Sequence, residues 1–427
     1  MIRRYTSAPT EVLGTRWPNI VAENQLIDYV KPIVERVKAE GDSAVTYYTE
    51  KFDGVRLDPT GFVINPDEIE EAYSHVTEEQ IAALKEAERR LEVVESARLK
   101  GLNFSVELDG VEVRSATRPL SRVGCYVPGG AAAYPSSLVM NVAPAKVAGV
   151  KEVLVCTPPG KDGRVNPLTL VAADICGVDR LFRVGGAQSI AALAYGTEMF
   201  PRVDKIVGPG NKYVTAAKIL VSDTVAIDKP AGPSEVLVLA DETAEPRLIA
   251  LDMISQVEHG AGGSAGLVAT SPRLADAVER LLEELTDQAP RREVVKDVLH
   301  SGGFIYTAES MEQAVDFVNN YAPEHLEVMT EEPSKVAEMI SSAGLILLGQ
   351  YTPVASTDYC AGTNHILPTG GYGKINPGLT VLDFLKPVML VESTKGGLEL
   401  LKKHVKVLSE AEGLPNHGLA VEGRFQT

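Results

Sequence analysis

The chain has 427 residues, enough for two or three domains with large buried cores. Its 41 Lys and Arg residues against 58 Asp and Glu residues give a net charge of −17, which argues against nucleic-acid or anionic-membrane partners, because both require a positive surface. Hydrophobic residues make up 44% of the chain, and no apolar run approaches the ~18 residues of a membrane span, so we expect an ordinary globular protein.

Two features of the sequence bear on the cellular compartment. Residues 1–7 place no apolar stretch behind their arginines, so we expect no secretory signal. The four cysteines are widely scattered and form no C-x-x-C pair, which disfavours a disulfide framework, a thiolate zinc site and thiol catalysis. We therefore expect a protein of the reducing cytoplasm.

The first predicted elements are helices, over residues 24–100, with Glu, Ala, Lys and Leu dominant from residue 66 onward. Residues 105–117 then alternate apolar and polar side chains around Asp109-Gly110. Because an Asp-Gly pair favours a tight turn, this stretch predicts a β-hairpin.

Residues 122–241 follow another rhythm, in which short apolar runs end in loops that open Ala-rich segments. Such alternation predicts βαβ units around a parallel sheet. The glycine-rich loops at 185–188 and 208–211 follow two of the runs, and ligands bind at such loops because backbone N–H groups face the crevice there. The predicted strands cover residues 152–156, 180–184, 203–207 and 235–239.

After residue 241 the alternation continues, so we expect two α/β domains with smaller terminal pieces. The predicted elements are a helix over 246–259, a strand over 266–270, a helix over 273–285, a strand over 303–307, a helix from 310, a strand over 344–349 and a helical region over 378–412.

Gln256 and His259 form the first candidate site. They lie three positions apart on the helix predicted from Pro246, so both side chains lie on one face. Gly260 favours a helix end here, where the partial negative charge also suits a capping histidine. The local sequence therefore leaves two readings open, a functional pair and a simple cap.

Glu324 and His325 form the second candidate site. Pro323 disfavours helical geometry in the residue before it, which predicts a loop-to-helix junction at this pair. A carboxylate beside an imidazole supplies two general bases of different pKa. An exposed polar dipeptide without a function is the alternative interpretation.

Other polar residues are ordinary when taken singly. Asp358, Glu412 and His417 lie in loop-like segments, and His365 is interpreted as a structural residue of the loop that holds Asp358. The remaining histidines lie in charged, helix-like stretches and are interpreted as surface residues: His75, His300 and His404.

Long strings of this sequence resemble the histidinol dehydrogenase family, the enzymes of the last steps of histidine biosynthesis. The resemblance extends from about Asn24 to His417. It implies two incomplete Rossmann-like parallel-sheet domains with small helical N- and C-terminal pieces, in an intertwined homodimer. Seven strings carry it, in the right order: Val123–Gly130, Val184–Gln188, Val207–Asn211, Asp228–Glu235, Gln256–His259, Ala322–Leu326 and Gly362–Thr369.

The resemblance also divides the chain. We expect an N-terminal segment over 1–27 and a discontinuous α/β domain over 28–121 and 236–378, on the metal and catalytic side. A second Rossmann-like domain over 122–235 is expected to bind NAD⁺. An arm over 379–427 is expected to reach into the neighbouring subunit's site.

Roles of single residues are implied by the motifs they match. The zinc ligands, holding one Zn²⁺ per subunit, are Gln256, His259, Asp358 and His417. The contacts to NAD⁺ are Tyr126, Gln188 and Asn211, and the catalytic bases are Glu324 and His325. Lining the histidinol site beside the zinc ligands are Ser234, His325 and Glu412.

The residue types suit the chemistry that the resemblance implies. Two imidazoles, a carboxylate and an amide oxygen suit Zn²⁺, and also Mn²⁺ or Co²⁺. His325 is expected to take the hydroxyl proton as hydride leaves, and Glu324 to activate water for the aldehyde step. The implied reaction converts histidinol, two NAD⁺ and water into histidine and two NADH, and it requires no nucleophilic cysteine.

The sequence departs from expectation in two places. Tyr213 occupies the third glycine position of a G-x-G-x-x-G fingerprint that begins at Gly208, which predicts an atypical nucleotide-binding mode. Residues 260–264 are richer in glycine than the acidic run typical of the family. Two alternatives stay open: a paralogous dehydrogenase of another small polar alcohol, such as sulfopropanediol, and a zinc hydrolase. The glycine-rich loops disfavour the hydrolase, since it needs no dinucleotide crevice.

Overall fold

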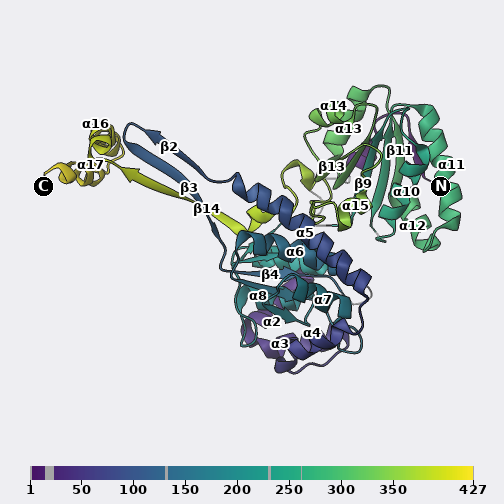
Figure 1. Cartoon of the computed structure of the whole chain (residues 1–427), viewed down its shortest axis with the longest axis horizontal. Coiled ribbons are helices and arrows are strands. Elements are labelled where there is room, and N and C mark those ends of the chain that lie inside the picture. Colours follow the sequence, from purple (N-terminus) through teal and green to yellow (C-terminus); the bar gives the residue numbers. More distant parts are fainter. Residues whose placement is uncertain (1, 15–23, 130–132, 229–231, 261, 427) are drawn as a thin grey trace.

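In the computed structural model, two α/β lobes are joined and a long arm projects from one of them (Figure 1). The structure describes residues 2–14, 24–129, 133–228, 232–260 and 262–426. Residues 15–23 of the expected N-terminal segment lie outside this part of the chain, as do Gly130 and residues 229–231 of the motif strings and Ala261 of the glycine-rich segment. Among the described residues, no helix combines the length and apolarity that a membrane crossing needs.

The first lobe is built on a six-stranded parallel sheet in the order β1-β11-β10-β9-β12-β13. Successive side chains of a strand point to opposite faces, so each face has its own apolar core. The strands are β1 (Arg3–Tyr5), β9 (Glu235–Ala240), β10 (Ser264–Ala269), β11 (Gly303–Thr307), β12 (His325–Met329) and β13 (Leu345–Leu348). One face packs on α10 (Pro246–Val257), α11 (Pro272–Gln288), α12 (Arg292–Gly302) and α15 (Val354–Tyr359). The other packs on α1 (Thr10–Gly14), α13 (Met311–Tyr321) and α14 (Pro333–Glu338).

The second lobe is built on a five-stranded parallel sheet in the order β6-β5-β4-β7-β8. Its strands are β4 (Arg122–Tyr126), β5 (Glu152–Cys156), β6 (Arg180–Phe182), β7 (Lys205–Val207) and β8 (Ala226–Ile227). One face packs on α4 (Pro66–Tyr73), α5 (Glu78–Lys100), α6 (Pro135–Ala148) and α7 (Pro167–Ile175). The other packs on α2 (Asn24–Glu40), α3 (Asp42–Asp53), α8 (Gly186–Tyr195) and α9 (Lys212–Val221). A short 3₁₀ turn, η1 (Pro59–Phe62), lies between α3 and α4.

The N-terminal helices belong to the second lobe. The expected division placed residues 28–121 with residues 236–378, whereas α2 to α5 pack on the five-stranded sheet. Their amphipathic patterns require an apolar partner but do not say which sheet supplies it.

The arm consists of a three-stranded antiparallel sheet and a helical tip (Figure 1). The predicted hairpin is confirmed: β2 (Phe104–Leu108) and β3 (Val111–Pro119) are joined by Asp109 and Gly110 at φ 51° and 81°. The returning strand β14 (Leu385–Ser393) pairs with β3 along its whole length. The tip contains α16 (Lys395–Ala411), α17 (Pro415–Glu422) and η4 (Gly423–Phe425), and the turns η2 (Tyr372–Lys374) and η3 (Val381–Phe384) precede the arm.

The helix predicted over 378–412 is wrong in its first half, because residues 385–393 form β14. Pro387 cannot lie inside a helix without losing a hydrogen bond, whereas an edge strand tolerates it. The junction at Glu324-His325 also differs from prediction, since His325 begins β12 rather than a helix. Most strand predictions hold within two residues, and β5 and β11 match at both ends.

Candidate active site

The site lies where the amino-terminal edge of the six-stranded sheet meets the carboxyl-terminal edge of the five-stranded sheet. Strands β9, β10 and β12 begin at this place, and β4 and β7 end there. A cavity of about 820 Å³ separates the two edges. From the first lobe it is lined by Ser234, Gln256, His259, Glu324, His325 and Asp358, and from the second by Pro128, Asn211, Lys212 and Thr215.

His325 is held in one orientation by the start of β9. Its Nδ1 lies 3.2 Å from the carbonyl oxygen of Glu235, which can only accept, so Nδ1 carries the proton. The Nε2 lone pair is therefore free, and no other group in the described structure hydrogen-bonds to it. Burial lowers the pKa of His325 to about 4, so the ring is neutral at physiological pH. The result is a buried, neutral imidazole with one available lone pair.

Glu324 stands beside this ring on the same strand start. Its Oε2 lies 3.6 Å from His325 Nδ1, and both residues are about 4% exposed or less. The two candidate bases predicted from the sequence are thus neighbours at the cavity wall.

Three of the four predicted metal ligands line the same cavity. Gln256 ends the last turn of α10 and is 2% exposed, and its Nε2 has no hydrogen-bond partner among the described residues. Burial lowers the pKa of His259, which keeps its ring neutral and able to donate a lone pair. Asp358 is carried by α15 and lies 3.6 Å from His325 Nε2. Burial raises the pKa of Asp358 to about 7, because it disfavours the charged carboxylate.

These donors fit a divalent cation. A carboxylate, a neutral imidazole and an amide whose Nε2 has no partner among the described residues form a mixed oxygen and nitrogen set of the kind that zinc accepts. Within the described part of one chain, no three His, Cys, Asp or Glu side chains come close enough to hold a metal.

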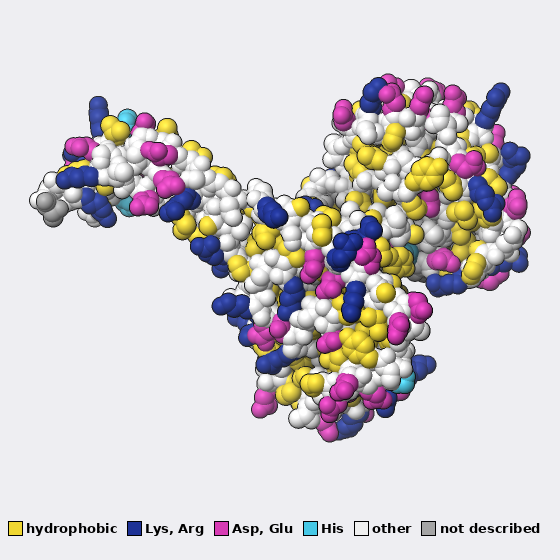
Figure 2. Space-filling view, viewed as in Figure 1, with side chains coloured by type: hydrophobic (Ala, Val, Ile, Leu, Met, Phe, Trp, Pro, Cys, Tyr) yellow, Lys and Arg dark blue, Asp and Glu magenta, His cyan; other side chains and the backbone are white. Residues whose placement is uncertain are grey.

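The remaining predicted residues, Glu412 and His417, lie at the tip of the arm. Both are exposed, neither lines the cavity, and α17 packs mainly on α16. Figure 2 shows the arm standing clear of both lobes. Within one chain the arm does not bring these side chains to the cavity.

His365 was interpreted as a structural loop residue, yet it lines the cavity. Its Nδ1 lies 2.7 Å from the carbonyl oxygen of Asp358, and its Nε2 lies 3.1 Å from the Ser137 hydroxyl. It therefore links the two lobes beside Asp358. Its position seven residues after Asp358 was the only sequence signal, and a loop gives no periodicity from which to infer a shared face.

The three predicted nucleotide contacts lie at the carboxyl ends of the second sheet or just beyond them. Tyr126 ends β4, and its hydroxyl accepts the Gly186 N–H at 3.3 Å. Gln188 is fully buried in α8, and both its amide atoms lack partners among the described residues. Asn211 caps α9 with hydrogen bonds from the N–H groups of Tyr213 and Val214. Of the three, Asn211 lines the cavity.

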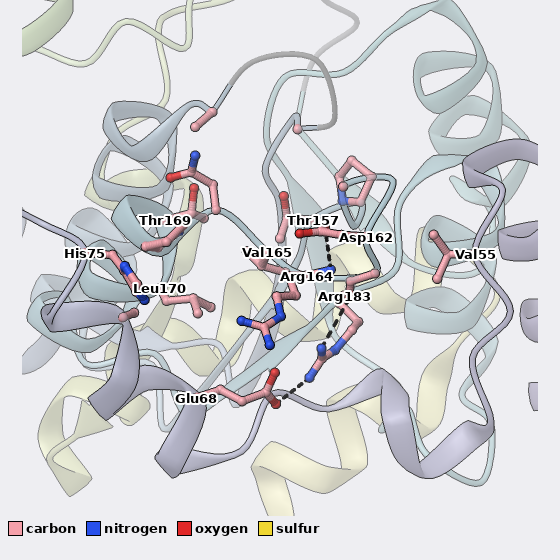
Figure 3. A pocket seen from close by; sticks show the side chains of 18 of the residues that line it. Val55, Glu68, His75, Thr157, Asp162, Arg164, Val165, Thr169, Leu170 and Arg183 are labelled. Carbon is pink, nitrogen blue, oxygen red and sulfur yellow. Dashed lines mark hydrogen bonds and ion pairs between the residues drawn. The ribbon is translucent and has the colours of Figure 1, made fainter.

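A second cavity of about 870 Å³ lies at the carboxyl-terminal edge of the five-stranded sheet, beside the ends of β5 and β6 (Figure 3). Arg183 crosses its floor, pairing with Glu68 and donating to the Gly163 carbonyl. Thr157, which follows β5, also lines it. Neighbouring residues connect the two cavities, since Pro128 and Tyr134 line the first and Gly129 and Ala133 the second.

The fold and site define a class. Paired parallel sheets, glycine-rich loops at a sheet edge where the strand order reverses, and a buried neutral histidine beside a carboxylate are the parts of a dehydrogenase.

Comparisons with known proteins are specific. A sequence profile described as histidinol dehydrogenase matches residues 19–425. Histidinol dehydrogenase from Methanosarcina mazei is 45% identical over 399 residues, covering 93% of this chain and 92% of the relative. Histidinol dehydrogenase from Heliobacterium mobile is 44% identical over 420 residues, covering 96% and 98%. The crystal structure of histidinol dehydrogenase from Elizabethkingia anophelis is similar at a TM-score of 0.94 with 36% identity, covering 100% of this chain and 98% of that one. The chain belongs to the histidinol dehydrogenase family.

Proposed function

We propose that this protein oxidises L-histidinol through L-histidinaldehyde to L-histidine, with reduction of two NAD⁺. The observation that carries the proposal is His325, a buried imidazole whose tautomer is fixed by the Glu235 carbonyl and whose free Nε2 lone pair lies among three potential metal ligands. A hydride can leave an alcohol carbon only as the hydroxyl proton is removed, and a neutral imidazole at that place serves this need.

In the first oxidation His325 accepts the hydroxyl proton at Nε2, while Nδ1 keeps its own proton and donates it in a hydrogen bond to the Glu235 carbonyl. The charged imidazolium that results is stabilised by two nearby carboxylates, Glu324 and Asp358, each with an oxygen 3.6 Å from the ring. Proton transfer to a positioned base of this kind contributes about 10²- to 10⁴-fold to a rate.

In the second oxidation a water molecule adds to the aldehyde carbonyl. Glu324 accepts the water proton, and the His325 imidazolium left by the first oxidation returns its proton to the carbonyl oxygen, which completes the hydrate. His325, neutral again, takes a hydroxyl proton of the hydrate as the second hydride leaves. The acid product ionises to a carboxylate, so the two oxidations together consume one water and two NAD⁺ and release two NADH and three protons.

A divalent metal, Zn²⁺ in the first instance, would be held by Gln256, His259 and Asp358 from one chain and His417 from a partner. It would supply Lewis-acid chemistry that favours loss of the hydroxyl proton. Ser234, Glu412 and the ligands surround the amino alcohol, and Glu412 supplies a negative charge for its amine.

NAD⁺ is proposed to lie along the carboxyl-terminal edge of the five-stranded sheet, across the shared wall of the two cavities. Asn211 would contact it in the first cavity, and Thr157, which follows β5, would contact it in the second. Tyr126 and Gln188, at the same sheet edge, are the other proposed contacts. This path needs no third glycine at Tyr213, which agrees with the incomplete fingerprint.

The arm is proposed to mediate an intertwined homodimer. Its sheet and helices leave large apolar side chains in water, including Leu108 at 70% exposed and Leu400 and Leu408 at 62% each. Exposed large apolar side chains on a projecting arm indicate a surface that a partner covers. A two-fold dimer that exchanges arms covers it and delivers Glu412 and His417 to the neighbouring cavity. We place the protein in the cytoplasm, where its four free thiols stay reduced.

One assay tests the function and its competitor. Purified protein with Zn²⁺, NAD⁺ and limiting histidinol should form two NADH per histidinol, with histidine as the product. The same assay with sulfopropanediol tests the paralogous activity. Turnover of sulfopropanediol without turnover of histidinol would replace the proposed substrate, and hydrolysis without NADH formation would replace the reaction class.

A further inference from the structure

Gly208 is the first residue after β7, at the point where the loop to α9 begins. Its φ is 114°, and a Cβ at this position would lie 2.1 Å from the Tyr126 carbonyl oxygen. Only glycine fits, because the loop passes directly against the end of the neighbouring strand β4. The next three residues, Pro209, Gly210 and Asn211, all line the active-site cavity.

A buried ion pair hydrogen-bonds to both the backbone N–H and the carbonyl of Gly208. Its N–H donates to Asp228 Oδ2 at 2.8 Å, and its carbonyl accepts from Lys218 Nζ at 3.0 Å. Lys218 and Asp228 also pair directly with each other. Their side chains are 4% and 2% exposed, so neither charge reaches solvent.

Packing alone does not account for this pair. Removing two charges from water is costly, and apolar side chains of similar volume often stabilise a core as well or better. Lys218 lies in the last turn of α9 and Asp228 directly follows β8, and neither lines either cavity. The pair fixes the peptide groups on both sides of Gly208.

We propose that Lys218 and Asp228 are positioning residues for the nucleotide, holding Gly208 so that the 208–211 backbone presents a rigid surface to NAD⁺. The proposal rests on the function proposed above. Preorganised backbone lowers the entropy cost of binding, so loosening Gly208 weakens nucleotide affinity without touching the bases or the metal ligands.

The test compares Lys218→Met and Asp228→Asn with a matched control, Lys146→Met. Lys146 pairs with Asp179 at 2.7 Å in the same lobe, but at a partly exposed position remote from Gly208. NADH binding to each full-length protein is measured by calorimetric titration, which requires no turnover, and steady-state kinetics and melting temperatures are recorded beside it.

Lys218→Met should raise the Kd for NADH and the KM for NAD⁺ by about tenfold, as expected for a lost hydrogen bond to a charged group. The KM for histidinol and the kcat at saturating NAD⁺ should change less than about twofold. Asp228→Asn keeps an acceptor for the Gly208 N–H and should give a smaller rise. Lys146→Met should bind NADH like the wild type.

The outcomes separate the two proposals. If the wild type binds no NADH, the proposed function fails. If the wild type binds NADH and Lys218→Met melts earlier but binds equally well, the pair is only structural and the positioning role is wrong. If Lys218→Met does not fold, the isosteric Asp228→Asn decides: weaker binding by severalfold supports the role, and unchanged binding contradicts it.

Discussion

Glu235 and Glu324 exchange hydrogen bonds between two neighbouring strand starts. Glu324 Oε2 accepts the Glu235 N–H at 2.8 Å, and Glu235 Oε1 accepts the Glu324 N–H at 3.2 Å. The Glu235 carbonyl also accepts from His325, so one residue of β9 positions both proposed bases. The unusual placement of the site, at the amino-terminal edge of a parallel sheet, is thereby stabilised by charge-assisted bonds to the first peptides of β9 and β12.

Substitutions of the two bases should slow the two half-reactions to different extents. Glu324→Gln keeps an oxygen that can accept the Glu235 N–H, so the strand starts stay in place while the water-activating charge is lost. We expect about 10²-fold or greater loss in the conversion of histidinaldehyde to histidine, with a smaller loss in histidinol oxidation. His325→Asn should slow both. Rapid-mixing kinetics started from histidinol and from histidinaldehyde measure the steps, and an equal loss for Glu324→Gln in both would assign it to general positioning.

Metal removal should abolish turnover, and Zn²⁺, Co²⁺ or Mn²⁺ should restore it. His259→Asn removes one nitrogen donor from a small ligand set, so its metal affinity should fall by about 100-fold or more, beyond the loss caused by changing an outer-sphere partner. Metal content after dialysis against a graded chelator measures the effect. His300→Asn, an exposed histidine of α12, is the control. Full activity of metal-free protein would contradict the metal's role.

Glu88 predicts a pH dependence of stability away from the site. Burial, and then the neighbouring charge of Glu92, raise the pKa of Glu88 from 4.5 to about 7. The folded state therefore holds this proton more tightly than the unfolded chain, and the free energy of unfolding falls as the pH rises from about 4.5 to 7. Glu88→Gln has no proton to lose. The melting temperature of Glu88→Gln should rise relative to that of the wild type as the pH increases from 5 to 8. A difference between the two melting temperatures that does not depend on pH would show that Glu88 does not cause the pH dependence.

Local sequence predicts most strands of the parallel sheets, because those strands are buried apolar runs. The runs at 152–156 and 303–307 become β5 and β11 without adjustment. It does not predict pairings between distant segments. Met389 pairs with Ser115, which is more than 270 residues away in the chain. The sequence around Met389 does not predict which strand it pairs with.

In the site, too, local spacing is predictable from the sequence and the approach of distant segments is not. Gln256 and His259 share a helix face, so their joint approach to the cavity follows from spacing. Asp358 comes from a short helix and His365 from a loop, and the positions of both depend on packing against the lobes. The family resemblance implies that Asp358 is a metal ligand. His365 is predicted to be a structural loop residue, and the contact with Ser137 of the other lobe could not be predicted from the sequence.

The most direct test of the account is complementation between two inactive chains. Gln256→Ala damages the cavity and His417→Ala damages the arm, and in one chain the helices that carry these residues, α10 and α17, lie apart (Figure 1). If the arm serves the partner's cavity, every mixed dimer assembles one intact site and one doubly damaged site. Random pairing makes about half of the dimers mixed, so roughly a quarter of wild-type sites should return on co-expression, by two-fold symmetry. No recovered activity, in mixed dimers confirmed to exist, would contradict a shared active site.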